Sequence, residues 1–188
     1  MQSVTELYNK ALAHLGAKRL LSPTDNSPLA TACGDAYPSD RDAVLRMHPW
    51  NCAIARYDLN RLTTDVTEVD DGSVYAFQLP SDCLRILDVA ITGDVWRREG
   101  DRIITDSATC AIRYVQRITD VVSFDPLLAE CIALKMAATL ALNGIGSRER
   151  AIDMERRFDA MMAEARYADA LERNRDTLTP IHLTESRI

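Results

Sequence analysis

The stretch 124–144, FDPLLAECIALKMAATLALNG, decides the fold predicted for this chain. It opens with Asp125 in the position that caps a helix, followed by Pro126 at the first helical position, where a missing N–H costs nothing. It closes on Gly144, a residue that tolerates a left-handed cap. Between these ends apolar and small residues cover most of the helix surface, so this helix needs neighbours on more than one side. We expect it at the centre of a helical body.

Length, composition and charge limit the possible classes of protein. The chain has 188 residues, 47% of them hydrophobic, which supports one substantial core or a core with a lobe. A formal net charge of −6 excludes a generally basic surface that binds nucleic-acid phosphates as the protein's main means of binding. Glu130 and Lys135, in the middle of the apolar stretch, argue against a membrane span of about 20 unbroken apolar residues. The five cysteines form no CxxC pair and follow no secretory leader, so we expect buried, reduced thiols in a protein made in the cytosol.

Two helices are predicted before the central one. The first begins at an S-x-x-E capping box, Ser3 to Glu6, and its apolar stripe ends at Gly16. The second spans 27–47. Ser27 is its expected capping residue, and Pro28 stands at the first helical position. Pro38 lies inside this second segment and is expected to bend it or divide it into two shorter helices, because proline removes a backbone hydrogen bond.

The chain after the central helix predicts one long helix and then an irregular tail. The helix runs from 147 to 173, and its apolar seam repeats at alternating spacings of three and four: Ala151, Met154, Phe158, Met161, Ala165 and Ala168. The tail, 174–188, has scattered apolar residues but no capping signal and no helical period. A frayed terminus and an extended arm that docks onto a partner both fit this pattern.

The segment 51–122 has the period of strands rather than helices. A His-Pro-Trp sequence at 48–50 ends the preceding helix, because the residue before a proline is pushed out of the helical region. We predict an antiparallel β meander with a hairpin turn at 99–101, from the extended runs 51–62, 74–79, 84–91, 94–98, 102–105 and 110–115. The acidic stretch 63–72 is expected as a solvated loop, since it lacks the ordered glycine and glutamate of an EF-hand.

These elements predict an α+β fold. It is an antiparallel helical bundle with an inserted antiparallel β region and a long C-terminal helix followed by an extended tail. The helical body comprises 1–50 and 123–173, the β region 51–122, and the C-terminal arm 174–188.

No motif for catalysis, cofactor binding or metal binding is visible. The three histidines lie far apart in the sequence, and neither a glycine-rich phosphate loop nor a nucleophile elbow occurs. We therefore expect no enzyme, no cofactor and no metal. Two alternatives stay open: a small cell-wall (peptidoglycan) hydrolase with a carboxylate pair formed by folding, for example Glu130 with Asp82, and a monomeric binding module.

Four strings, in their order and spacing, resemble the tail tubular protein A family of short-tailed bacteriophages. They are LYNKALAHLG at 7–16, HPWN at 48–51, YAFQLPSDCLR at 75–85 and FDP at 124–126. Members of this family are head-to-tail adaptors, also called connector or gatekeeper proteins. The resemblance extends from about Thr5 to Arg173, and it departs from the family pattern at Pro38 and in the tail.

The resemblance implies a structural protein of the virion neck, assembled in the host cytoplasm. It implies a self-assembled ring, usually of twelve copies, between the portal protein and the tail nozzle, tubular protein B. Double-stranded viral DNA would pass through the lumen without sequence-specific binding, and no membrane would be involved. We expect four residues to anchor the β region on the helical body, namely Trp50, Pro80, Asp82 and Arg85. We expect four residues of the arm to contact the portal, namely Pro180, Ile181, Leu183 and Ile188.

Overall fold

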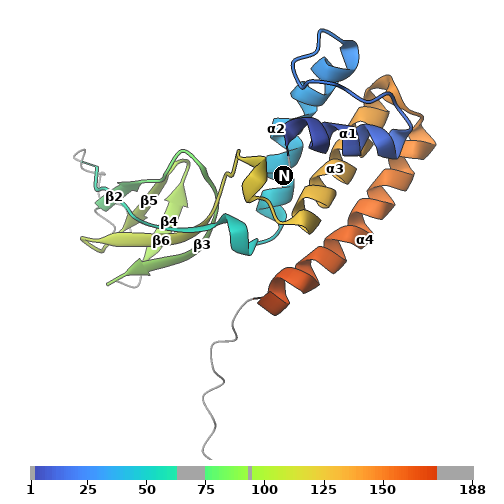
Figure 1. Ribbon diagram of the computed structural model, residues 1–188. Coiled ribbons are helices and arrows are strands. Elements are labelled where there is room, and N and C mark those ends of the chain that lie inside the picture. Colours follow the sequence, from blue (N-terminus) through green and yellow to red (C-terminus); the bar gives the residue numbers. More distant parts are fainter. Residues whose placement is uncertain (1–2, 63–74, 93–94, 173–188) are drawn as a thin grey trace, which may run out of the picture.

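The computed structural model describes residues 3–62, 75–92 and 95–172 as a mixed α+β fold (Figure 1). Its helices are α1 (Val4–Leu15), α2 (Pro28–Met47), α3 (Pro126–Leu140) and α4 (Arg148–Glu172). Its strands are β1 (Ile54–Asp58), β2 (Tyr75–Gln78), β3 (Cys83–Ile91), β4 (Trp96–Glu99), β5 (Arg102–Thr105) and β6 (Cys110–Gln116). The predicted acidic loop at 63–72 and the arm at 174–188, with its four predicted portal contacts, lie outside the described residues.

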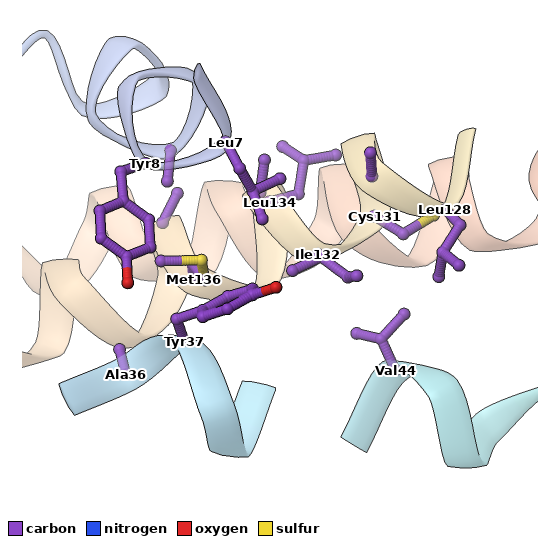
Figure 2. Packing of buried hydrophobic residues seen from close by; sticks show 14 of the residues in the cluster. Leu7, Tyr8, Ala36, Tyr37, Val44, Leu128, Cys131, Ile132, Leu134 and Met136 are labelled. Carbon is purple, nitrogen blue, oxygen red and sulfur yellow. The ribbon is translucent and has the colours of Figure 1, made fainter. Parts of the chain in front are cut away.

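Helix α3 is the helix that the other three contact, as the stretch 124–144 predicts. The Asp125 carboxylate caps its start by accepting hydrogen bonds from the N–H groups of Leu127 (2.8 Å) and Leu128 (3.3 Å). Ten of its residues are buried, on more than one face. In Figure 2 Tyr8 of α1 and Tyr37 of α2 lie beside Met136 of α3, and the two tyrosine rings meet edge to face with centroids 5.7 Å apart.

The helical stretch closes at Gly144 with a positive φ, as predicted, but its last turn is wider than an α-helix. Regular helix stops at Leu140 and a wider turn, η3 (Ala141–Ile145), follows, in which Gly144 has a φ of 95°. By length and composition Pro126–Ile145 would suffice to cross a membrane. Core helices of soluble proteins have the same length and composition, and most of this segment is buried inside the fold.

Helices α1 and α2 begin where their capping residues predict. Ser3 and the Glu6 side chain form the reciprocal capping box, and Gly16 ends α1 with a φ of 70°. Of the two outcomes expected at Pro38, division into two shorter helices is wrong, because α2 is one helix from Pro28 to Met47. The bend stays a prediction. Both Pro38 and Gly34, whose carbonyl loses its usual partner, are exposed, so water can satisfy that carbonyl.

Helix α4 buries a slightly different seam from the predicted one. Met162 and Asp169 are buried, whereas the predicted Met161 and Ala168 are only half-buried. A straight helix of 3.6 residues per turn drifts away from a strict 3.5-residue repeat, so the buried line moves by one position along 25 residues.

The strands form two three-stranded antiparallel sheets rather than the predicted meander. The first has the order β1-β6-β3 and the second the order β2-β5-β4. Only β4 and β5 form the predicted hairpin, around Gly100 with a φ of 61°. The predicted run 51–62 is divided: its first residues form a short 3-10 turn, η1 (Asn51–Ala53), then β1 follows, and Arg61 forms a bridge with Phe77 of β2.

Buried residues form two hydrophobic clusters. The larger one joins the four helices and includes Trp50 and Val115, and Leu84 and Leu87 of β3 pack against it. The smaller one lies among the strands. Some residues of the first sheet therefore pack against the helices. In Figure 1 both sheets lie to one side of the helices.

Candidate functional site

Several hydrogen bonds and ring contacts meet at the junction where the chain passes between the helices and the sheets. Trp50 lies at its centre and is 0% exposed. Its indole N–H donates a hydrogen bond of 3.1 Å to the Val44 carbonyl, near the end of α2. The His48 ring packs against the indole edge to face, with ring centroids 4.9 Å apart. The bend after α2 is thus built around a fully buried aromatic side chain.

Asp82 fixes the turn between β2 and β3 to the end of β6. Its carboxylate accepts hydrogen bonds from Gln116 Nε2 (2.7 Å) and from the Tyr114 hydroxyl (3.3 Å). Burial, together with the nearby Asp82 charge, raises the pKa of Tyr114 to about 12. The turn is closed by the Cys83 N–H, which donates to the Pro80 carbonyl at 3.0 Å. Pro80 and Asp82 therefore position β3 against β6.

Arg85 lies on the other side of the junction, between β3 and α2. Its guanidinium lies 3.5 Å from the Arg46 carbonyl, and the Arg46 guanidinium in turn donates to the Leu84 carbonyl. Two reciprocal contacts to backbone carbonyls thus join the end of α2 to the start of β3. Neither arginine has a carboxylate within 4 Å among the residues that the structure describes.

A third connection, between α2 and the end of β6, is absent from the predicted anchors. Arg117 donates to the Asp42 carboxylate at 2.7 Å and to the Ser81 carbonyl at 3.2 Å. Asp42 also accepts from Arg41, a buried arginine, at 2.7 Å. No sequence spacing signals this network, because Asp42 and Arg117 are 75 positions apart.

Asp169 near the end of α4 is the most informative residue that the sequence reasoning missed. It is 8% exposed, and its two carboxylate oxygens lie 2.9 Å from His48 Nε2 and 2.9 Å from the Asn51 backbone N. The Asn51 side chain donates to the Asp169 carbonyl at 2.7 Å. The far end of α4 is therefore fastened to the junction, next to the position where the arm 174–188 begins in the sequence.

The structure gives Glu130 and Asp82, the proposed carboxylate pair, separate sets of partners. Glu130 on α3 lies 3.1 Å from Lys10 Nζ and 2.8 Å from His14 Nε2, both on α1. The hydrogen bond from His14, with the smaller contribution of Lys10, holds the pKa of Glu130 at about 2. A carboxylate with so low a pKa is a poor general acid at neutral pH. Within the described residues no group of three or more His, Cys, Asp or Glu side chains is placed to hold a metal ion.

The cysteines are all free thiols, but the expected burial holds only for some of them. Cys33, Cys110 and Cys131 are buried, and burial raises the pKa of Cys33 to about 11 and that of Cys131 to about 12. Cys83 is half-buried, and the prediction of burial is wrong for Cys52, which is exposed. The buried thiols are thus protonated and unreactive at neutral pH.

Comparison with known proteins assigns no family. A scan against protein-family models and a search of curated proteins both find no match for this chain.

Proposed function

We propose that this chain is a head-to-tail adaptor of a short-tailed bacteriophage. In this proposal it is a structural virion protein that assembles in the host cytoplasm as a ring between the portal protein and the tail nozzle. Double-stranded DNA passes through the lumen during retention and ejection, without sequence-specific contacts. The protein has no catalytic role and uses no cofactor.

The observation that supports this proposal is the position of the four strings that resemble the tail tubular protein A family. The string 7–16 covers most of α1, and 48–51 covers the bend at Trp50. The string 75–85 spans β2, the Asp82 turn and the start of β3, and 124–126 caps α3. The last three of these strings lie where one element follows the next. A resemblance concentrated at such positions is evidence for a shared architecture, because these residues determine how the elements connect.

We assign a separate role in the ring to each part of the chain. We propose that α1 to α4 act as an antiparallel helical body forming the ring wall, and that the sheets, which lie to one side of the helices (Figure 1), reach the tail nozzle. We assign the portal contact to the arm 174–188, whose predicted contacts are Pro180, Ile181, Leu183 and Ile188. The net charge of −6 favours a lumen past which DNA slides rather than adheres.

Native mass spectrometry of the chain, alone and mixed with the portal ring encoded by the same genome, tests the proposal. We expect the portal ring to gain about twelve copies of this chain, even if the free chain is monomeric, because binding to a template drives assembly by mass action. Two unassociated species in the mixture would contradict the proposal. Proteomic analysis of purified virions supplies an independent check, since an adaptor stays in the particle.

A further inference from the structure

Exposed arginines lie on the face of the first sheet that points away from the second sheet. In β6, Ile112 and Tyr114 belong to the buried cluster between the strands, so Arg113, which alternates with them, points to the opposite face and is exposed. Arg56 of β1 is the direct partner of Arg113 in the register, and it is exposed as well. Like charges directly opposite each other on neighbouring strands destabilise a sheet. An anion bound over this pair would remove the repulsion.

Two more arginines extend this surface toward the helices. Arg85 of β3 is paired with Val115 of β6, two positions from Arg113 and therefore on the same face. Arg46 at the end of α2 contacts the same part of β3 through the Leu84 carbonyl, and Arg46 and Arg85 line one depression. Both side chains are exposed. We call the surface formed by these residues the arginine face: Arg46, Arg56, Arg85 and Arg113.

The carboxylates of this surface do not neutralise it. Asp88, the partner of Arg113 on β3, and Asp58 at the end of β1 are exposed on the same face. Within the described residues no ion pair joins either aspartate to an arginine of the face. Four arginines against two aspartates leave an excess of two positive charges, in a chain whose formal net charge is −6. A local excess of this sign attracts an anionic partner.

The same chain carries an anionic segment of matching charge. The stretch 63–72, which lies outside the described residues, has four carboxylates and no lysine or arginine: Asp65, Glu68, Asp70 and Asp71. Arginine and carboxylate groups form charge-assisted, often bidentate hydrogen bonds, so such a pairing is specific in geometry as well as in charge. The acidic stretch is therefore a suitable occupant of the arginine face.

The acidic stretch is attached to the second sheet, on the side away from the arginine face of its own copy. The Leu62 N–H donates to the Ala76 carbonyl of β2 at 2.8 Å, and β2 begins directly after 63–74. The second sheet packs on the opposite face of the first one, through the cluster that includes Phe77 and Ile112. The twelve residues 63–74 span at most about 40 Å, or about 20 Å out and back. The stretch can therefore reach a neighbour beside the second sheet, whereas its own arginine face lies behind the first sheet.

We infer that the arginine face binds the acidic stretch 63–72 of a second copy of this chain. The guanidinium groups of one copy donate hydrogen bonds to the carboxylates of the next. Because the two surfaces differ, the contact is heterologous, which is the type that generates rings. The inference rests on the proposed function in that it names a contact between neighbouring copies in the adaptor ring.

A pair of charge-reversal variants tests this contact in the mixture with the portal ring. The first is Arg56→Glu with Arg113→Glu. The second reverses the acidic stretch, with Asp65→Lys, Glu68→Lys, Asp70→Lys and Asp71→Lys. We expect each variant alone to raise the concentration needed for assembly at least about tenfold, because like charges then meet at every contact. An equimolar mixture of the two should recover most of this loss, since alternating copies present opposite charges to each other.

A matched control carries the change of charge of the first variant elsewhere. Lys18→Glu with Arg19→Glu alters two cationic side chains after α1 that are exposed, like Arg56 and Arg113. We expect this control to assemble like the unmodified chain. An equal loss in the control, recovered equally by the lysine variant, would assign the effect to overall charge and overturn the inference. Circular dichroism and urea midpoints equal to those of the unmodified chain show that each variant is folded.

The possible outcomes separate this inference from the proposed function. If the unmodified chain joins the portal and Arg56→Glu with Arg113→Glu does so equally well, the contact is wrong and the adaptor role stands. If both variants fail alone and their mixture recovers nothing, the contact between copies is overturned, because a stretch that binds its own copy gains nothing from mixing. If the unmodified chain gains no place on the portal, the adaptor role fails. Sedimentation velocity of the free chain at low ionic strength then decides the contact, and absence of self-association at every concentration overturns it.

Fluorescence anisotropy of a labelled DNA duplex tests the other anionic occupant, a phosphate backbone. We expect Arg56→Glu with Arg113→Glu to bind the duplex no differently from the unmodified chain. If the variant loses duplex binding while its assembly on the portal is unchanged, the arginine face binds DNA and the inference is overturned.

Discussion

Trp50 offers the most direct test of how the helices and sheets are held together, because the chain contains only two tryptophans and the other is exposed. Truncation to alanine removes an indole that is 0% exposed. An aromatic side chain buries about 150–250 Å², which at about 25 cal/mol/Å² corresponds to about 4–6 kcal/mol. Measured tryptophan or phenylalanine truncations in cores cost about 3–5 kcal/mol. Loss of the hydrogen bond from the indole N–H to the Val44 carbonyl adds about 1 kcal/mol.

We therefore expect Trp50→Ala to lower the free energy of unfolding by about 4–5 kcal/mol, a large part of the about 5–15 kcal/mol typical of a domain. Urea unfolding followed by circular dichroism at 222 nm measures the change. If the alanine variant does not fold, Trp50→Phe supplies the graded test, because it keeps most of the ring and removes the N–H donor, at a cost of about 1–3 kcal/mol.

Trp96→Ala is the matched control. Trp96 lies on β4 and is 43% exposed, so its truncation should cost less than about 1.5 kcal/mol. A loss below about 1 kcal/mol for Trp50→Ala, or equal losses for the two tryptophans, would refute the reasoning that the buried indole holds the junction. Emission spectra give a second comparison: the fluorescence that survives in Trp50→Ala comes from Trp96 alone and should lie at the longer wavelength of an exposed indole.

Three other outcomes are expected. The hydrogen bond from His14 holds the Glu130 pKa at about 2, below its ordinary 4.5, so the ionised form stabilises the fold. Glu130→Gln should cost about 1–2 kcal/mol at pH 7 once solvent screening is considered, a loss that vanishes in urea titrations as the pH falls from about 4.5 to about 2. Burial raises the pKa of Asp40, so its ionised form destabilises the fold at pH values above those at which carboxyl groups ordinarily titrate. Asp40→Asn should therefore raise the urea midpoint at pH 7. A lower midpoint would contradict the prediction that the ionised carboxylate is destabilising. Deleting 174–188 should abolish portal binding while leaving the circular dichroism intact, and unchanged portal binding would refute the arm assignment.

The sequence predicts the elements whose signals are local. The caps at Ser3 and Asp125 and the turns at Gly16 and Gly100 depend on residues a few positions apart, so short patterns suffice to find them. No local pattern of residues tells whether Pro38 divides its helix. Whether a proline divides a helix depends on which face of the helix is solvated, and that is settled by packing against other elements.

Strand order is the part of the fold that local patterns leave open. A meander would place each strand beside the next, yet β6 lies between β1 and β3, with Ile112 paired to Tyr57 on one side and Val89 on the other. Each strand has the same alternating pattern whichever neighbour it takes. The choice follows from the shared core, because Val115 of β6 belongs to the cluster of the helices while Ile112 belongs to that of the strands.

Buried polar residues explain why the candidate site was only partly foreseen. Asp169 interrupts an apolar seam, and an aspartate on a helix rich in charges reads as a solvated residue. Its burial becomes intelligible only when His48 and Asn51, about 120 positions earlier, supply hydrogen bonds to its carboxylate. His48 also packs on the Trp50 ring. A change at Asp169 therefore reaches Trp50 through one shared imidazole, so substitutions at these two positions should couple rather than add. The end of α4, the bend after α2 and the entry into the sheets thus form one connected structure.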